Sequence, residues 1–116
     1  MTWLWLSAAF MATTALVHGF LGERRLIQPL LTLDQGIMNV DLARKVFRLA
    51  WHALSLLMLV SAASVVWPGT PQSLILVIGA AWTATGLFDA VYTRGKHIGW
   101  PFLTGSGIFA IIGALA

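Results

Sequence analysis

The sequence predicts an all-α integral membrane protein whose four transmembrane helices form an up-down bundle in one domain, residues 1–116. Of its 116 residues, 59% are hydrophobic and only 9% are charged, and the mean hydropathy is +0.85. Soluble domains average about 45–50% apolar and about 25% charged residues. A soluble chain of this length could not bury so much apolar side chain, so lipid is the expected solvent.

Four apolar segments are long enough to cross a hydrocarbon core of about 30 Å at about 1.5 Å per residue. The second and third are separated by the turn sequence WPGTPQ, and the third and fourth by TRGKH. Proline and glycine in such short connections are typical of tight turns between antiparallel helices. The expected spans are residues 3–22, 45–67, 73–93 and 98–116.

Only the link between the first two spans, residues 23–44, is long. Its apolar portion LIQPLLTL is interrupted by Pro29, which predicts a short interfacial segment lying along the lipid headgroups. Asn39 or Asp41 is expected to cap the start of the second helix, because short polar side chains satisfy the first free N–H groups of a helix.

The charges predict the orientation. Every charged residue falls within 23–48 or 89–96, including all seven Lys and Arg, and a four-span topology places these two windows on the same side. The positive-inside rule makes that side cytoplasmic and places both termini on the non-cytoplasmic side. We therefore expect a multi-pass protein of the cell inner membrane, and the basic balance reflects topology and not nucleic-acid binding.

Small residues recur along three of the spans at helical spacing. Such stripes let transmembrane helices approach closely, and we expect them to form internal seams, with a dimer surface as the alternative. The stripes are Ala8, Ala12, Ala15, Gly19 and Gly22; Gly79, Thr83, Gly86 and Ala90; and Gly105, Gly107, Ala110 and Ala114.

Ionisable side chains inside the spans predict a buried polar layer in the cytoplasmic half of the bundle. Such groups usually face other protein and not lipid. We expect Arg48 and Asp89 to form a buried ion pair, while His18 and His52 bond to backbone or hydroxyl groups of neighbouring helices. In this interpretation the layer fixes the register of the bundle.

The same residues also allow a ligand site. His18 and His52 on neighbouring antiparallel helices could ligate a b-type haem, with its propionates toward Arg44, Lys45 and Arg48. A divalent metal site would use His18, His52 and Asp89, with Glu23 or His97 as a further ligand.

The basic cytoplasmic face suggests contacts at the headgroup level. Arg24, Arg25, Arg44 and Lys45, together with Arg48, are expected to hold anionic lipid or an acidic partner there.

Enzyme signatures are missing from the sequence, which contains no H-E-x-x-H, no glycine-rich phosphate loop and no G-x-S-x-G. It also has no cysteine, which excludes disulfides and thiolate chemistry.

Length and span count resemble those of the small multidrug-resistance transporters, which work as dimers around a carboxylate in the first helix. Here the first acid is Glu23, at the very end of that span, so the resemblance stops at size.

The sequence therefore favours a non-enzymatic accessory, assembly or oligomerising subunit, organised by its polar layer. Its expected partners are membrane lipids and either further copies of itself or a larger membrane complex. The alternative is a transmembrane haem b- or metal-binding protein that uses His18 and His52. A small oligomeric transporter or channel is less favoured, because no charged residue occupies the outer half of any span.

Overall fold

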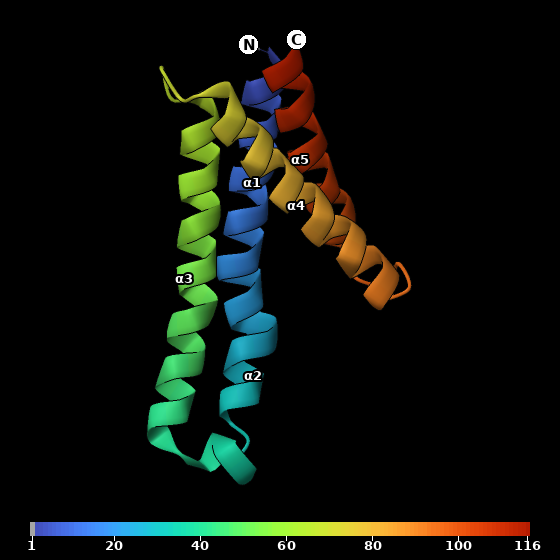
Figure 1. The fold of residues 1–116 in the computed structure, drawn as a ribbon. Coiled ribbons are helices and arrows are strands. Elements are labelled where there is room, and N and C mark those ends of the chain that lie inside the picture. Colours follow the sequence, from blue (N-terminus) through green and yellow to red (C-terminus); the bar gives the residue numbers. More distant parts are fainter. Residues whose placement is uncertain (1) are drawn as a thin grey trace.

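The computed structural model describes residues 2–116, which form four long helical segments that alternate in direction (Figure 1). The first segment is composite, because two wide π-helical stretches, η1 and η2, connect α1 to α2. A short 3₁₀ turn, η3, precedes the second segment. The bounds are α1 Thr2–Leu16, η1 Val17–Leu21, η2 Glu23–Ile27, α2 Gln28–Leu31, η3 Gly36–Asn39, α3 Asp41–Val66, α4 Gln72–Tyr92 and α5 Trp100–Leu115.

Three of these segments are long and apolar enough to cross a membrane: Thr2–Leu31, Asp41–Val66 and Gln72–Tyr92. The fourth, α5, is equally apolar but has only 16 residues, a length of about 24 Å. The predicted all-helical class and the approximate places of the four helices are confirmed. Both chain ends lie together at one end of the molecule (Figure 1).

The first helix is longer than the sequence suggested. It does not end at Gly22 but continues to Leu31, so most of the apolar LIQPLLTL stretch extends the first helix and is not a separate segment. Pro29 lies in the first turn of α2, directly after the wide turns of η2, where a missing N–H is most easily accommodated.

The second helix also begins earlier than expected, at Asp41 and not at Lys45. Neither Asn39 nor Asp41 caps it, because the N-cap residue is Val40 and no side chain bonds to the free N–H groups there. Asp41 instead lies in the first turn, where its negative charge interacts favourably with the helix dipole.

The helices form an open row in the order α3, α1, α5, α4. α1 packs against both α3 and α5, and α5 packs against α4, whereas α3 and α4 make little contact. Figure 1 shows that α3 and α4 diverge from the turn that joins them. The helices alternate in direction as an up-down bundle does, but one side of the row stays open.

The seam between α4 and α5 is built from small residues, as predicted. A Cβ atom added at Gly86 would lie 2.5 Å from the backbone nitrogen of Thr104, and one added at Gly79 would lie 3.0 Å from the carbonyl oxygen of Gly107. Between α1 and α5, the buried hydroxyl of Ser7 donates to the carbonyl oxygen of Ser106 at 2.7 Å. These close approaches bring the backbones of neighbouring helices together.

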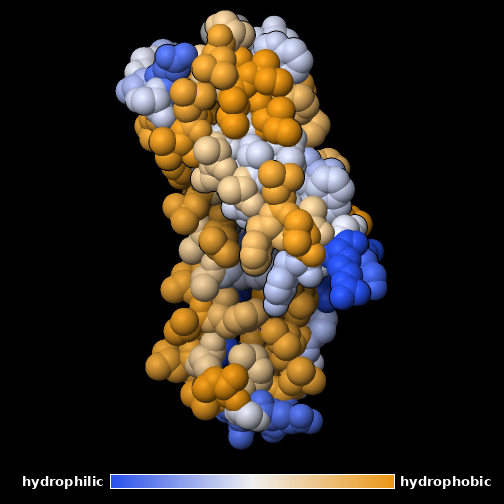
Figure 2. All heavy atoms as spheres, turned by 45° about the vertical axis from the view of Figure 1, so that its right-hand side comes forward, coloured by the Kyte–Doolittle hydropathy of each residue, from blue (hydrophilic) through white to orange (hydrophobic). Residues whose placement is uncertain are grey.

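The surface is mostly hydrophobic along its length of 51 Å (Figure 2). Hydrophilic residues gather at the two ends and at one intermediate level on the right of Figure 2, where the α4–α5 turn lies. Because α4 and α5 are shorter than their neighbours, this turn reaches only part of the way along the hairpin made by α1, α2 and α3.

Candidate functional site

Polar side chains gather where the C-terminal part of the first helix passes the N-terminal half of α3. We call this group the α1–α3 polar cluster, and it consists of His18, Glu23, Arg48, Trp51, His52 and Ser55.

Glu23 is the acceptor at the centre of this cluster. The Nε of Arg48 donates to its Oε1 at 2.8 Å, and Nη2 of the same guanidinium lies 3.4 Å from Oε2. Nε2 of His52 lies 3.1 Å from Oε1. The Glu23 side chain is only 21% exposed, against 48% for Arg48 and 40% for His52. One carboxylate therefore connects the first helix to two successive turns of α3.

His18 makes three contacts with two residues of α3. Its Nδ1 lies 2.6 Å from Oγ of Ser55, and its carbonyl oxygen accepts a hydrogen bond of 2.8 Å from Nε1 of Trp51. The imidazole and indole rings also stack, with centroids 4.0 Å apart and planes inclined by 11°. These contacts fix the orientation of both rings.

Two glycines allow this close approach. A Cβ atom at Gly22 would lie 2.6 Å from the ring of Trp51, and one at Gly19 would lie 3.3 Å from Oγ of Ser55. Residues spaced by four, such as Gly19 and Glu23, drift by about 40° per step around a regular α-helix. The wider turns of η1 and η2 reduce this drift, and both residues contact α3.

The predicted ion pair between Arg48 and Asp89 is wrong. Arg48 pairs with Glu23, whereas Asp89 pairs with Nδ1 of His97 across the α4–α5 turn. The physical reason is the order of the row, because α3 packs beside α1 and makes little contact with α4. The polar groups therefore form two separate clusters and not one layer across three helices.

The candidate metal ligands are likewise divided. His18 and His52 lie on adjacent antiparallel helices, as expected, but Asp89 lies in the other cluster. Within residues 2–116, no three His, Asp or Glu side chains are grouped so that they could hold a metal ion. The predicted His18, His52 and Asp89 site is therefore not formed.

The surroundings of the two histidines also leave no space for haem. Nδ1 of His18 and Nε2 of His52 face Ser55 and Glu23, and Trp51 packs closely against Gly22 between the helices. A macrocycle ligated by both imidazoles would have to separate α1 from α3, so these residues do not fit the group in this arrangement.

The four residues predicted to hold headgroups or a partner lie in two places. Arg44 and Lys45 form ion pairs of 3.3 Å and 3.0 Å with Asp41 in the first turn of α3. Arg24 and Arg25 lie on a different element, η2 of the first helix.

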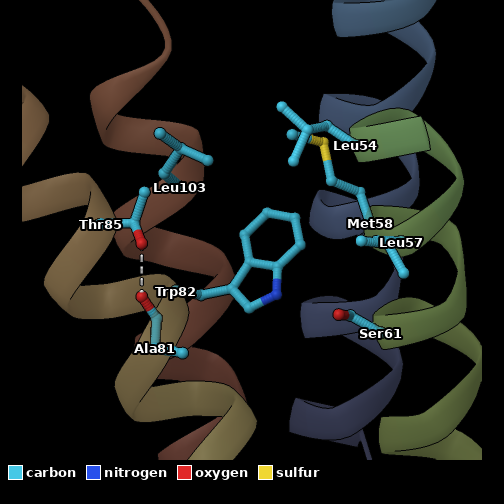
Figure 3. Close-up of a pocket in the computed structure, with 8 residues that line it drawn as sticks. All are labelled: Leu54, Leu57, Met58, Ser61, Ala81, Trp82, Thr85 and Leu103. Atoms are coloured by element: carbon cyan, nitrogen blue, oxygen red, sulfur yellow. Dashed lines mark hydrogen bonds between the residues drawn. The ribbon is translucent and has the colours of Figure 1, made fainter. Parts of the chain in front are cut away.

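A groove lies on the open side of the row, between α3 and α4. Its volume is about 210 Å³. Figure 3 shows the indole of Trp82 projecting from α4 into the space that faces α3. The hydroxyl of Thr85 bonds to the carbonyl oxygen of Ala81 at 2.7 Å, so the surface of this α3–α4 groove is essentially apolar. Its lining consists of Leu54, Leu57, Met58, Ser61, Ala81, Trp82, Thr85 and Leu103.

No protein-family model, curated protein or solved structure matches this chain. The geometry alone must therefore indicate what the chain can do. The polar cluster offers helix-to-helix contacts whose donors and acceptors are already engaged with one another. The groove offers an apolar surface on the unpaired side of two helices.

Sequence reasoning missed three members of the polar cluster as contact residues: Glu23 as the ion-pair partner, Trp51 and Ser55. A signal for Glu23 was present, because the end of one span and the start of the next lie at the same depth in an antiparallel hairpin. Continuing the first helix through Glu23 places its carboxylate opposite Arg48 and His52. Trp51 lies one residue before His52, and its contact with Gly22 follows from the same alignment.

Proposed function

We propose that this chain is a small non-enzymatic, multi-pass protein of the cell inner membrane that acts as an accessory or assembly subunit. In this proposal its four helices cross the bilayer, the charged end of the row faces the cytoplasm and both termini face the opposite side. Support comes from the three long apolar helices and from the absence of Lys and Arg outside residues 23–48 and 89–96.

The observation that carries the proposal is the α3–α4 groove. Each of these two helices packs extensively against another helix on one side only, α3 against α1 and α4 against α5. The facing walls include the small side chains of Ser61, Ala81 and Thr85, and small residues allow transmembrane helices to associate closely. An additional apolar helix seated between α3 and α4 would convert the open row into a closed bundle.

The shape of the groove favours a different membrane protein over a second copy as the occupant. A two-fold contact places the same patch of both copies face to face. Here that patch is concave. Two copies related by a two-fold axis would therefore bring two concave surfaces together and would make little contact. A partner with a protruding transmembrane helix fits the groove better, and the oligomerising alternative becomes an outcome of the test.

The α1–α3 polar cluster has a supporting role in this proposal. Its ion pair and hydrogen bonds fix the axial register of α3 on the first helix, and side-chain contacts of this kind set register between packed helices. They thereby hold the α3 wall of the groove in place although α4 does not brace it.

The test is site-specific photocrosslinking in native membranes. A photoreactive residue is placed at Leu57 on one wall of the groove, at Ala81 on the other wall, and at Phe20 as a control. Phe20 is 72% exposed and lies on η1, outside the groove lining. We expect the two groove positions to capture the same membrane protein, identified by mass spectrometry, and Phe20 to capture lipid only.

Three outcomes would contradict the proposal. A groove adduct of twice the chain mass would show that the occupant is a second copy of this chain. Identical adducts at all three positions would show that crosslinking is not specific to the groove. A Soret band in the purified protein that is lost in both His18→Ala and His52→Ala would establish the haem-binding alternative.

A further inference from the structure

A second cavity lies at the opposite end of the molecule from the chain termini, between α2 and the first three turns of α3. Its volume is about 730 Å³, which is within the range of about 300–1,000 Å³ that small-molecule sites occupy. It is separate from the α3–α4 groove, with which it shares no lining residue.

Three cations line this cavity. Arg44 and Lys45 are adjacent in α3, Arg48 lies one turn further along the helix, and all three border the same space. Two carboxylates balance them only in part: Asp41 pairs with both Arg44 and Lys45, and Glu23 pairs with Arg48. Three positive and two negative charges leave one uncompensated positive charge, and the side-chain amide of Gln28 adds hydrogen-bonding capacity at the wall.

The apolar part of the cavity continues directly along the helix. Leu31 and Leu49 belong to the same lining as the cations. Lys45, Leu49, Leu56 and Val60 fall on one face of α3 at helical spacing, and the three apolar members are 69%, 61% and 52% exposed. A positively charged recess is thus followed by an exposed apolar stripe that runs toward the middle of the molecule.

We propose that this cavity binds the phosphate group of an anionic phospholipid, whose acyl chains lie along the apolar stripe of α3. A phosphodiester carries one negative charge, equal to the positive charge that the two carboxylate partners leave uncompensated on the three cations, and guanidinium groups bind phosphate oxygens through charge-assisted hydrogen bonds. The apolar stripe distinguishes a lipid from free phosphate as the source of that group. The inference relies on the membrane location proposed above but not on the α3–α4 groove or its partner.

The experiment measures lipid binding to the purified full-length chain in detergent by native mass spectrometry. Phosphatidylglycerol is the anionic probe, and phosphatidylcholine is the zwitterionic reference. Removing two cations from the recess in Arg44→Gln/Lys45→Gln is expected to weaken phosphatidylglycerol binding by about tenfold or more. The matched control, Arg94→Gln/Lys96→Gln, removes the same charge in the α4–α5 turn, outside the cavity lining, and is expected to change binding less than about twofold.

A single variant separates loss of binding from loss of folding. The Lys45 side chain is 75% exposed, so Lys45→Gln removes one cation at the mouth of the cavity without disturbing buried packing. It is expected to weaken binding of phosphatidylglycerol by about threefold or more while leaving the unfolding temperature unchanged. Equal losses in the cavity and control pairs, or equal binding of phosphatidylcholine, would overturn the proposal. Inorganic phosphate that binds alone and displaces the lipid would assign the site to a soluble anion and would overturn it as well.

Discussion

At the scale of single residues, Glu23 determines how the first helix meets α3. Its carboxylate accepts from Arg48 at 2.8 Å and contacts His52 at 3.1 Å. In the proposed membrane location, removing one partner from such a pair leaves the other charge uncompensated in a poorly hydrated position, whereas removing both leaves no isolated charge. The contacts of Glu23 should therefore be energetically coupled and not additive.

A double-mutant cycle tests this coupling. Glu23→Ala and Arg48→Ala are each expected to lower the free energy of unfolding in detergent, and the double variant is expected to lose less than the sum of the two. Glu23→Ala combined with His97→Ala serves as the reference, because His97 belongs to the separate cluster with Asp89 and distant sites add. Additivity of Glu23 and Arg48 would mean that the pair contributes nothing measurable.

The sequence identified Arg48 and His52 as residues that need polar partners, because ionisable groups are costly within apolar helices. It could not identify the partner. Asp89 and Glu23 are both carboxylates at comparable depth, and the choice between them depends on which helix packs beside α3. That information lies in the packing of the row and not in the pattern of any single span.

At the scale of elements, the boundaries of the first two helices differ most from expectation. Charges at Glu23, Arg24 and Arg25 followed by Pro29 resemble the end of a span, and a helix of about 20 residues already satisfies the bilayer thickness. The helix nevertheless continues to Leu31 through η1 and η2, because the wide π turns accommodate Pro29 without breaking the hydrogen-bonded backbone.

The small-residue seams were predictable for a different reason. A glycine or alanine every three or four residues predicts close helix approach whichever neighbour is present. The α4–α5 seam formed at Gly79, Gly86 and Gly107 as the spacing indicated. The pattern did not indicate that α4 would pair with α5 alone and leave its other side open.

Gly107 provides a sharp test of this seam. A Cβ atom there would meet the backbone of Thr83 and the carbonyl oxygen of Gly79, which cannot move independently of α4. Gly107→Ala is expected to lower the free energy of unfolding by about 1–3 kcal/mol through overpacking. The measurement is chemical or thermal unfolding of the purified protein in detergent.

Gly105→Ala is the control on the same helix. Its added Cβ would lie 3.3 Å from the ring of Phe10, a side chain that can shift by a few tenths of an ångström, and alanine also favours the helix by about 1 kcal/mol. The control is therefore expected to be close to neutral. If the two variants are equally destabilised, the rigidity of the α4 backbone is not the reason.

At the scale of the whole molecule, the row consists of two antiparallel hairpins that share one end. The chain termini and the turn after α3 lie at that end (Figure 1), and the charged residues belong to other parts of the chain, within residues 23–48 and 89–96. In the proposed orientation the shared end is non-cytoplasmic, and the turn between α4 and α5 with Arg94 and Lys96 faces the cytoplasm.

Topology reporters test this orientation directly. A reporter fused to either terminus is expected to report from the non-cytoplasmic side, and the same reporter inserted after Gly95 is expected to report from the cytoplasm. Gly95 lies in the exposed α4–α5 turn, so the insertion leaves the helices intact. Termini that report from opposite compartments would contradict a four-span arrangement.

In the proposed membrane location, the unequal length of the two hairpins has a consequence for the surrounding lipid. The first contains helical segments of 30 and 26 residues, whereas the second contains helices of 21 and 16 residues. A bilayer core of about 30 Å exceeds the roughly 24 Å of α5, so acyl chains beside α5 must compress while those beside α3 remain extended. Such hydrophobic mismatch costs a fraction of a kcal/mol per Å. The protein should therefore partition into the thinner of two coexisting membranes and deform thick ones unevenly around its circumference.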